Sequence, residues 1–146
     1  MSLGEYLADQ KFRRVALSRT GIGHFEVAGT LNGHPVRILI DTGAASTVAS
    51  LARVRELGLP VEPLARCGAG AGGANLQVFR VDGAELRLGA VVPRLGALLA
   101  MDLTHVNAAL AQKGVAPVDV ILGVDVFDAH VAVIDYGSAS LFLREP

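Results

Sequence analysis

The chain has 146 residues, enough for one domain with its own core and too few for two comfortable ones. Hydrophobic residues make up 51% of the chain, which excludes disorder, and only 5% are aromatic, so the core must consist mainly of Val, Leu, Ile and Ala. Thirteen basic and fourteen acidic residues give a net charge of −1, so the chain lacks the basic surface that nucleic-acid binding requires.

The first third of the chain is predicted to form β-strands. Residues 12–17 form a first strand, and two charged arginines within it favour the edge of a sheet. Residues 24–31 and 34–40 are β-prone runs on either side of Asn32-Gly33. A two-residue Asn-Gly turn between such runs is a strong hairpin signal, because both of its positions need positive φ.

The second strand of this hairpin leads directly into Asp41. The nearly continuous apolar run of residues 36–40 indicates that this strand is buried, so Asp41 should lie at the end of a core strand. Thr42 and Gly43 follow, and a glycine there lets backbone N–H groups approach and hold the carboxylate ionised. Asp and Gly are also common in ordinary turns, so Asp-Thr-Gly by itself fits a purely structural turn as well.

The middle of the chain should contain a helix, a glycine-rich loop and two strands. Residues 50–57 have helical spacing, with Ser50 as N-cap and Gly58 as the stop. The glycine-rich loop, 68–73, precedes a strand over 77–81, and Asp82-Gly83 is predicted to turn this strand into a hairpin with residues 85–88.

The last third should contain a second helix and three strands. Residues 103–113 have helical spacing and end at Gly114, and 118–122 form a buried strand that ends at Gly123. Residues 130–134 and 141–143 are predicted to close the chain as a hairpin. The sum is one mainly-β domain with one or two short helices.

Other kinds of site have weaker support. Gly68, Gly70 and Gly73 satisfy a G-x-G-x-x-G spacing, but no helix follows, so nucleotide binding is disfavoured. The four histidines show no metal-ligand spacing, and each is expected at the surface or in a turn. The lone Cys67 excludes an intrachain disulfide and is more typical of packing than of a nucleophile. Three further acidic residues are expected to be structural, one of them by bracing the turn after Gly123; they are Asp119, Asp125 and Asp135.

The chain contains no apolar run of the length that a membrane span requires. Its polar N-terminus, Met1 to Arg14, lacks the apolar segment of a signal peptide. Because a leader can have been removed before Met1-Ser2-Leu3, the compartment stays open.

Several motifs, in order, resemble the retroviral-type (retropepsin-like) aspartic proteases and their bacterial relatives. Residues 37–48 are similar to the apolar-Asp-Thr-Gly-Ala signature of that family, and the helix after them ends in Leu57-Gly58-Leu59. Residues 68–73 and the next strand are similar to the flap, a hairpin that closes over bound peptide. Residues 120–123 resemble the second, apolar-apolar-Gly motif, and 132–143 resemble the closing strands of bacterial members. The resemblance covers roughly residues 22–143.

The resemblance implies a retropepsin-like acid-protease β-barrel half over residues 22–146, preceded by an N-terminal extension and first strand over 1–21. It implies an aspartic endopeptidase that works as a homodimer on peptide or protein substrates, without metal or organic cofactor. The expected catalytic residues are Asp41, Thr42 and Gly43. The expected substrate-binding residues are Ala44, Ala71, Gly72 and Gly73, the last three near the flap tip.

Two features depart from the viral members of the family. Viral proteases carry acidic residues shortly after Asp-Thr-Gly-Ala and an arginine after the second-motif glycine, whereas this chain has Ala45, Ser46 and Val124 there. The viral ion-pair network at the dimer contact is therefore absent. A binding or scaffolding dimer without activity, and a protease that processes only itself, remain alternative functions.

Overall fold

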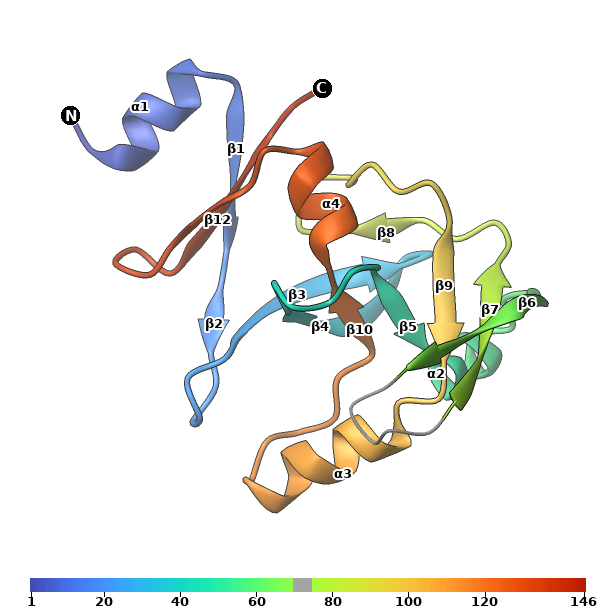
Figure 1. Cartoon of the computed structure of the whole chain (residues 1–146). Helices are drawn as coiled ribbons and strands as arrows, with labels where there is room; N and C mark the ends of the chain where they lie inside the picture. The colour runs from blue at the N-terminus through green and yellow to red at the C-terminus, as the bar shows by residue number, and fades with distance from the viewer. Residues whose placement is uncertain (70–74) are drawn as a thin grey trace.

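The computed structural model describes residues 1–69 and 75–146 and has the mainly-β fold that the sequence predicts (Figure 1). The described residues form four short helices: α1 (Leu3–Asp9), α2 (Leu51–Glu56), α3 (Thr104–Gln112) and α4 (Val124–Ala129). The strands are β1 (Phe12–Ala16), β2 (Ser18–Arg19), β3 (Phe25–Leu31), β4 (His34–Ile40), β5 (Val48–Ser50), β6 (Val61–Ala69), β7 (Asn75–Val81), β8 (Leu86–Arg87), β9 (Leu98–Met101), β10 (Val120–Leu122), β11 (Val133–Asp135) and β12 (Ser140–Arg144).

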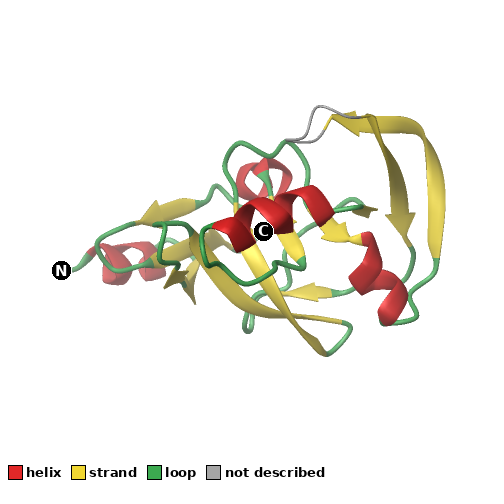
Figure 2. Ribbon diagram, turned by 90° about the horizontal axis from the view of Figure 1, so that it is seen from below, coloured by secondary structure: helices red, strands yellow, loops and turns green. Residues whose placement is uncertain are grey.

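The strands form two sheets. A three-stranded sheet has the order β1-β12-β11, so the two ends of the chain pair with each other and β1 is an edge strand, as predicted. The larger sheet has the order β2-β3-β4-β10-β5-β9-β7-β6, with β8 paired to β3. Figure 2 shows the three-stranded sheet near the N-terminus and the β6–β7 hairpin at the opposite end of the molecule.

The Asn32-Gly33 turn joins β3 to β4 as predicted. Asn32 has a φ of 48° and Gly33 a φ of 81°, the conformation that this kind of two-residue turn needs. The side chain of Asn32 also accepts the N–H of Glu85 and donates to the carbonyl of Gly83. The turn is therefore tied to the segment that leads into β8.

The strand that carries Asp41 lies in the middle of the larger sheet. β10 pairs in parallel with β4, Leu122 opposite Ile40, and antiparallel with β5. Asp41 directly follows Ile40 at the end of β4, and Gly123 directly follows Leu122 at the end of β10. The two motifs, 82 residues apart in sequence, are therefore brought side by side by strand register.

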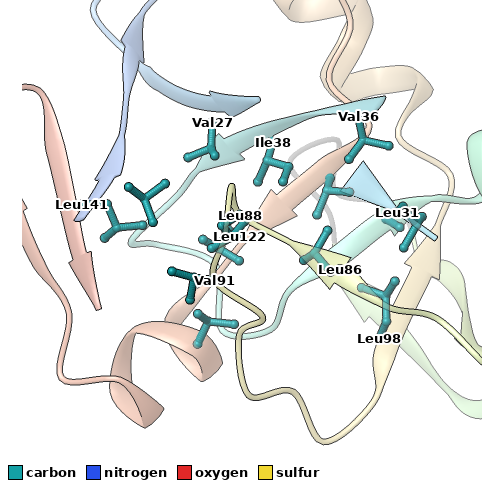
Figure 3. Close-up of a cluster of buried hydrophobic side chains, with 14 of the residues drawn as sticks. Val27, Leu31, Val36, Ile38, Leu86, Leu88, Val91, Leu98, Leu122 and Leu141 are labelled. Carbon is teal, nitrogen blue, oxygen red and sulfur yellow. The ribbon is translucent and has the colours of Figure 1, made fainter. Parts of the chain in front are cut away.

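The main hydrophobic core contains side chains from both sheets, and most of those labelled in Figure 3 come from the larger sheet. Its fully buried side chains are aliphatic and include Leu31, Ile38, Leu88, Leu122 and Leu141. Burying one such side chain contributes about 1.5–3 kcal/mol relative to leaving it in water. A smaller cluster, in which Leu39, Leu110 and Ile121 take part, is formed with α3. Both clusters rely on aliphatic residues, in line with the low aromatic content.

Two local predictions were incomplete or wrong. The sequence predicted one or two helices and missed α1 and α4. α1 is stabilised by a local N-cap, and α4 by the packing of its buried side chains. The predicted hairpin across Asp82-Gly83 is wrong: the turn forms, but β8 pairs with β3 rather than with β7. The Asn32 side chain holds the start of this segment against the β3–β4 turn, which gives β8 a different neighbour.

The strands on either side of the expected flap tip form an antiparallel hairpin. β6 pairs with β7 from Val61 opposite Val81 to Ala69 opposite Asn75. The expected tip residues Ala71, Gly72 and Gly73 lie outside the described residues. Among the residues that are described, none of the helices is long and apolar enough to cross a membrane.

Candidate active site

Asp41 begins a tight turn at the end of β4. Its backbone N–H donates to the carbonyl of Leu122 at 3.0 Å, which continues the β4–β10 pairing to the carboxylate-bearing residue itself. Its Oδ1 accepts the N–H of Gly43 at 2.9 Å. An ideal Cβ at Gly43 would lie 3.2 Å from this same oxygen, so a side chain would crowd the carboxylate. The turn thus fixes the carboxylate with a backbone donor, as the motif predicts.

Gly123 packs directly on the turn that carries Asp41. An ideal Cβ at Gly123 would lie 2.6 Å from the carbonyl oxygen of Ala44 and 2.9 Å from the carbonyl group of Ser46. These are backbone atoms, which cannot move aside as a flexible side chain can. The N–H of Val124 donates to the carbonyl of Ala44 at 2.8 Å. Only glycine fits this contact between the two motifs.

A buried threonine connects the same two segments from within. Thr47 is 0% exposed, and its Oγ1 donates to Asp125 Oδ1 at 2.7 Å and accepts the N–H of Gly123 at 3.0 Å. The Asp125 carboxylate also accepts the N–H groups of Thr47 and Val126. Asp125 therefore braces the turn after Gly123, as the sequence predicts, and it also holds the end of the Asp41 turn.

The Asp41 turn opens into a cleft of about 240 Å³. The carboxylate-bearing strand, the segment before β3 and the end of β11 form its walls. The lining residues are Gly23, His24, Phe25, Leu39, Ile40, Asp41, Thr42, Ile134 and Tyr136. Among these lining residues Asp41 is the only carboxylic acid. One chain therefore brings a single acidic group to this cleft.

The predicted site residues fall into three groups. Asp41 and Thr42 line the cleft, and Gly43 bonds to the Asp41 carboxylate. Ala44 packs on the smaller hydrophobic cluster and joins the Asp41 turn to Val124 through its backbone. The expected flap-tip residues, Ala71, Gly72 and Gly73, lie outside the residues that the structure describes.

Sequence reasoning missed Thr47 and most of the cleft wall. Thr47 lies within the signature segment, which is the one signal that could have indicated it. Its hydrogen-bond partner Asp125 is 78 residues away in the sequence, so no local pattern connects the two. Phe25, Ile134 and Tyr136 reach the cleft only through the pairing of distant strands.

His130 lies in the turn after α4, in keeping with the expectation of a surface or turn position, but it is buried. This side chain is 3% exposed. Its Nε2 accepts the N–H of Arg94 at 2.8 Å, and its Nδ1 lies 2.9 Å from the carbonyl oxygen of Arg144. With Nδ1 as donor and Nε2 as acceptor, the ring joins the Arg94 segment to the end of β12. Among the described residues, no group of three potential ligand side chains could hold a metal ion.

The Thr47 hydroxyl can be tested by replacing it with a side chain of the same shape. We expect Thr47→Val to lower the free energy of unfolding by about 1–3 kcal/mol, because the Gly123 N–H loses its acceptor and Asp125 a donor. Thr30→Val is the matched control, since Thr30 lies in β3 and its hydroxyl makes no hydrogen bond to a residue that the structure describes. Urea denaturation of the three proteins measures the difference. Equal losses for both variants would show that the Thr47 network does not stabilise the turn.

The chain was compared with protein-family models, curated sequences and solved structures. A family model described as aspartyl protease matches residues 27–126, a stretch that contains both Asp41 and Gly123. No curated protein sequence matches the chain significantly.

Three solved structures are similar to the chain in fold. The retroviral protease-like domain of Ddi1 from Leishmania major has a TM-score of 0.56 and 17% identity, over 83% of this chain and 88% of that one. A retropepsin-like aspartic protease from Rickettsia conorii has a TM-score of 0.54 and 15% identity, over 90% of both chains. EIAV protease complexed with the inhibitor HBY-793 has a TM-score of 0.54 and 20% identity, over 77% of this chain and 92% of that one.

Proposed function

Because the chain belongs to the aspartyl protease family and has a retropepsin-like fold, we propose that it is an aspartic endopeptidase whose active site forms from two copies of the chain. The observation that supports this most is the Asp41 turn. Its carboxylate lies at the end of a buried strand, accepts a backbone N–H and opens into a cleft. The same turn is locked to the second motif through Gly123 and Thr47.

The need for a second chain follows from the chemistry. Hydrolysis of a peptide by water requires one group that takes a proton from the water and another that donates a proton. The cleft offers one carboxylic acid per chain. A two-fold axis through the cleft pairs a residue with its own copy, so it would bring two Asp41 carboxylates together. Two carboxylates held close together share a single proton, because both cannot ionise easily.

In the proposed mechanism the ionised carboxylate takes a proton from a water molecule as the water oxygen attacks the carbonyl carbon of the peptide. The protonated carboxylate donates its proton to the carbonyl oxygen, which gives a tetrahedral diol. The carboxylate that received the water proton then gives it to the nitrogen, and the other carboxylate takes a proton from a diol hydroxyl as the C–N bond breaks. An acid and an amine are released, and the pair again holds one proton. Thr42 lines the cleft and Gly43 orients Asp41 through its N–H.

The proposal is tested by incubating the purified protein with a denatured mixed-protein substrate from acid to neutral pH and detecting new peptide termini by mass spectrometry. We expect internal cleavage of the substrate. A binding or scaffolding domain would release no peptides under any of these conditions. A protease that acts only on itself would cleave its own flanking sequence and leave the added substrate intact.

A further inference from the structure

An arginine and two aromatic rings form a cluster beside the Asp41 cleft. The rings of Phe25 and Tyr136 meet edge to face, with centroids 4.8 Å apart and an interplanar angle of 66°. The Arg19 guanidinium carbon lies 5.2 Å from the centroid of Phe25 and 5.3 Å from that of Tyr136. Such distances allow cation–π attraction to both rings. The cluster thus joins β2, β3 and the turn after β11.

The two aromatic rings of this cluster belong to the cleft wall, and Arg19 contacts that wall. Phe25 and Tyr136 both line the cleft that contains Asp41, and so does Gly23. The Nε of Arg19 donates to the carbonyl of Gly23 at 3.3 Å, and its Nη2 lies 3.8 Å from where a Cβ of Gly23 would be. Gly23 has a φ of +88°, which favours glycine, and its missing side chain leaves the guanidinium uncovered there.

The positive charge of Arg19 is not neutralised by an ion pair with any residue that the structure describes. Asp135, next to Tyr136 in sequence, bonds within its own turn to Ser138 Oγ at 2.6 Å and to the N–H of Gly137. The Ser138 hydroxyl holds the pKa of the Asp135 carboxyl below its usual value. Glu26, next to Phe25, pairs instead with Arg37. The terminal Nη groups of Arg19 therefore remain as donors.

We propose that Arg19, Phe25 and Tyr136 form a specificity subsite that receives the carboxylate side chain of an Asp or Glu in the peptide substrate. This inference depends on the proposed protease function and adds a substrate class to it. A guanidinium binds a carboxylate through two parallel N–H donors, and its stacking on the rings holds it in place for that contact. The exposed face of Tyr136 can pack against the aliphatic stem of the substrate residue. Arg19 selects substrate here and takes no part in proton transfer.

The test uses a peptide that the wild-type protein cleaves, with both termini blocked, in which each position around the scissile bond is changed in turn to Glu, Gln or Lys. At one position we expect kcat/KM for Glu to exceed that for Gln by about tenfold, with Lys lower still. In Arg19→Glu this order should reverse, so that the Lys peptide is cleaved with higher kcat/KM than the Gln peptide, and the Gln peptide with higher kcat/KM than the Glu peptide.

Two further variants make the test specific. Arg87→Glu is the matched control, because Arg87 is an exposed arginine on β8 that pairs with Glu85, whereas Arg19 contacts the lining residues Gly23, Phe25 and Tyr136. It should keep the wild-type order of substrates. Arg19→Gln should remove the preference for Glu without creating one for Lys, which tests the charge even if Arg19→Glu folds poorly.

The outcomes separate this proposal from the protease function. Cleavage of the parent peptide with equal efficiency for Glu, Gln and Lys, unchanged in Arg19→Glu, would overturn the subsite and leave the protease function standing. Absence of cleavage of any peptide would overturn the protease function, and the subsite with it.

Discussion

Replacing Asp41 with asparagine is expected to abolish proteolysis and leave the fold intact. Asparagine has the same shape and still offers an oxygen to the Gly43 N–H, which Asp41 Oδ1 accepts at 2.9 Å. It can neither take a proton from water nor share one with a second carboxylate. Loss of one acid–base group typically costs about 100- to 10,000-fold in rate. Release of peptides from a denatured protein, with circular dichroism to check the fold, measures this effect.

The control for this variant is Asp102→Asn. Asp102 has the same local pattern as Asp41, because its Oδ1 accepts the N–H of Thr104, two residues further on, at 2.8 Å. It does not line the Asp41 cleft. Its substitution should therefore leave the rate of proteolysis unchanged. Turnover by Asp41→Asn at close to the wild-type rate would remove Asp41 from the mechanism.

Gly123→Ala is expected to have the largest effect on stability and to reduce activity as well. The new methyl group would lie 2.6 Å from the Ala44 oxygen and 2.9 Å from the Ser46 carbonyl group, both of which are backbone. Overpacking of this kind costs about 1–3 kcal/mol in the free energy of unfolding. Because the displaced segment carries Asp41, a shift of about 1 Å would also lower the rate about 100-fold.

Gly96→Ala serves as the comparison for Gly123→Ala. A Cβ at Gly96 would meet no atom within 4 Å, and its φ lies outside the left-handed region. This change should leave stability and activity nearly unaltered. Thermal unfolding of both variants, followed by activity measured well below the melting temperature, separates loss of fold from displacement of the site. Equal behaviour of the two variants would show that the contact between Gly123 and the Asp41 turn is unimportant.

Parts of the fold that depend on local chemistry could be predicted from the sequence. Asn32-Gly33 needs positive φ at both positions and forms the predicted turn. The helix α2 has the predicted N-cap, because the Ser50 hydroxyl accepts the N–H of Arg53. α1 carried a similar signal that was overlooked: Ser2 accepts the N–H of Glu5, three residues later.

Other features depend on contacts between distant segments, which local patterns do not reveal. α4 contains β-branched and aspartate residues that favour helices weakly, and it forms where Val126 and Phe127 are buried in the core. β8 follows the turn at Asp82-Gly83 but pairs with β3, because the side chain of Asn32 holds Glu85 beside the β3–β4 turn. For the candidate site, the sequence indicated the Asp41 turn and the glycine beside it. It could not indicate the Thr47 bridge, which depends on the β4–β10 pairing. It could not indicate the cleft wall either, because β3 and the turn after β11 meet there only in the folded chain.

The most direct test of the shared site is to mix wild-type chains with an increasing excess of Asp41→Asn chains and to measure activity per wild-type chain. Sedimentation velocity on the same samples, with one chain labelled, shows how far mixed dimers form. If each site needs two Asp41 carboxylates, activity per wild-type chain should fall to about one tenth at roughly ninefold excess of the variant, since random pairing leaves few wild-type pairs. Undiminished activity per wild-type chain in samples that contain mixed dimers would contradict the account.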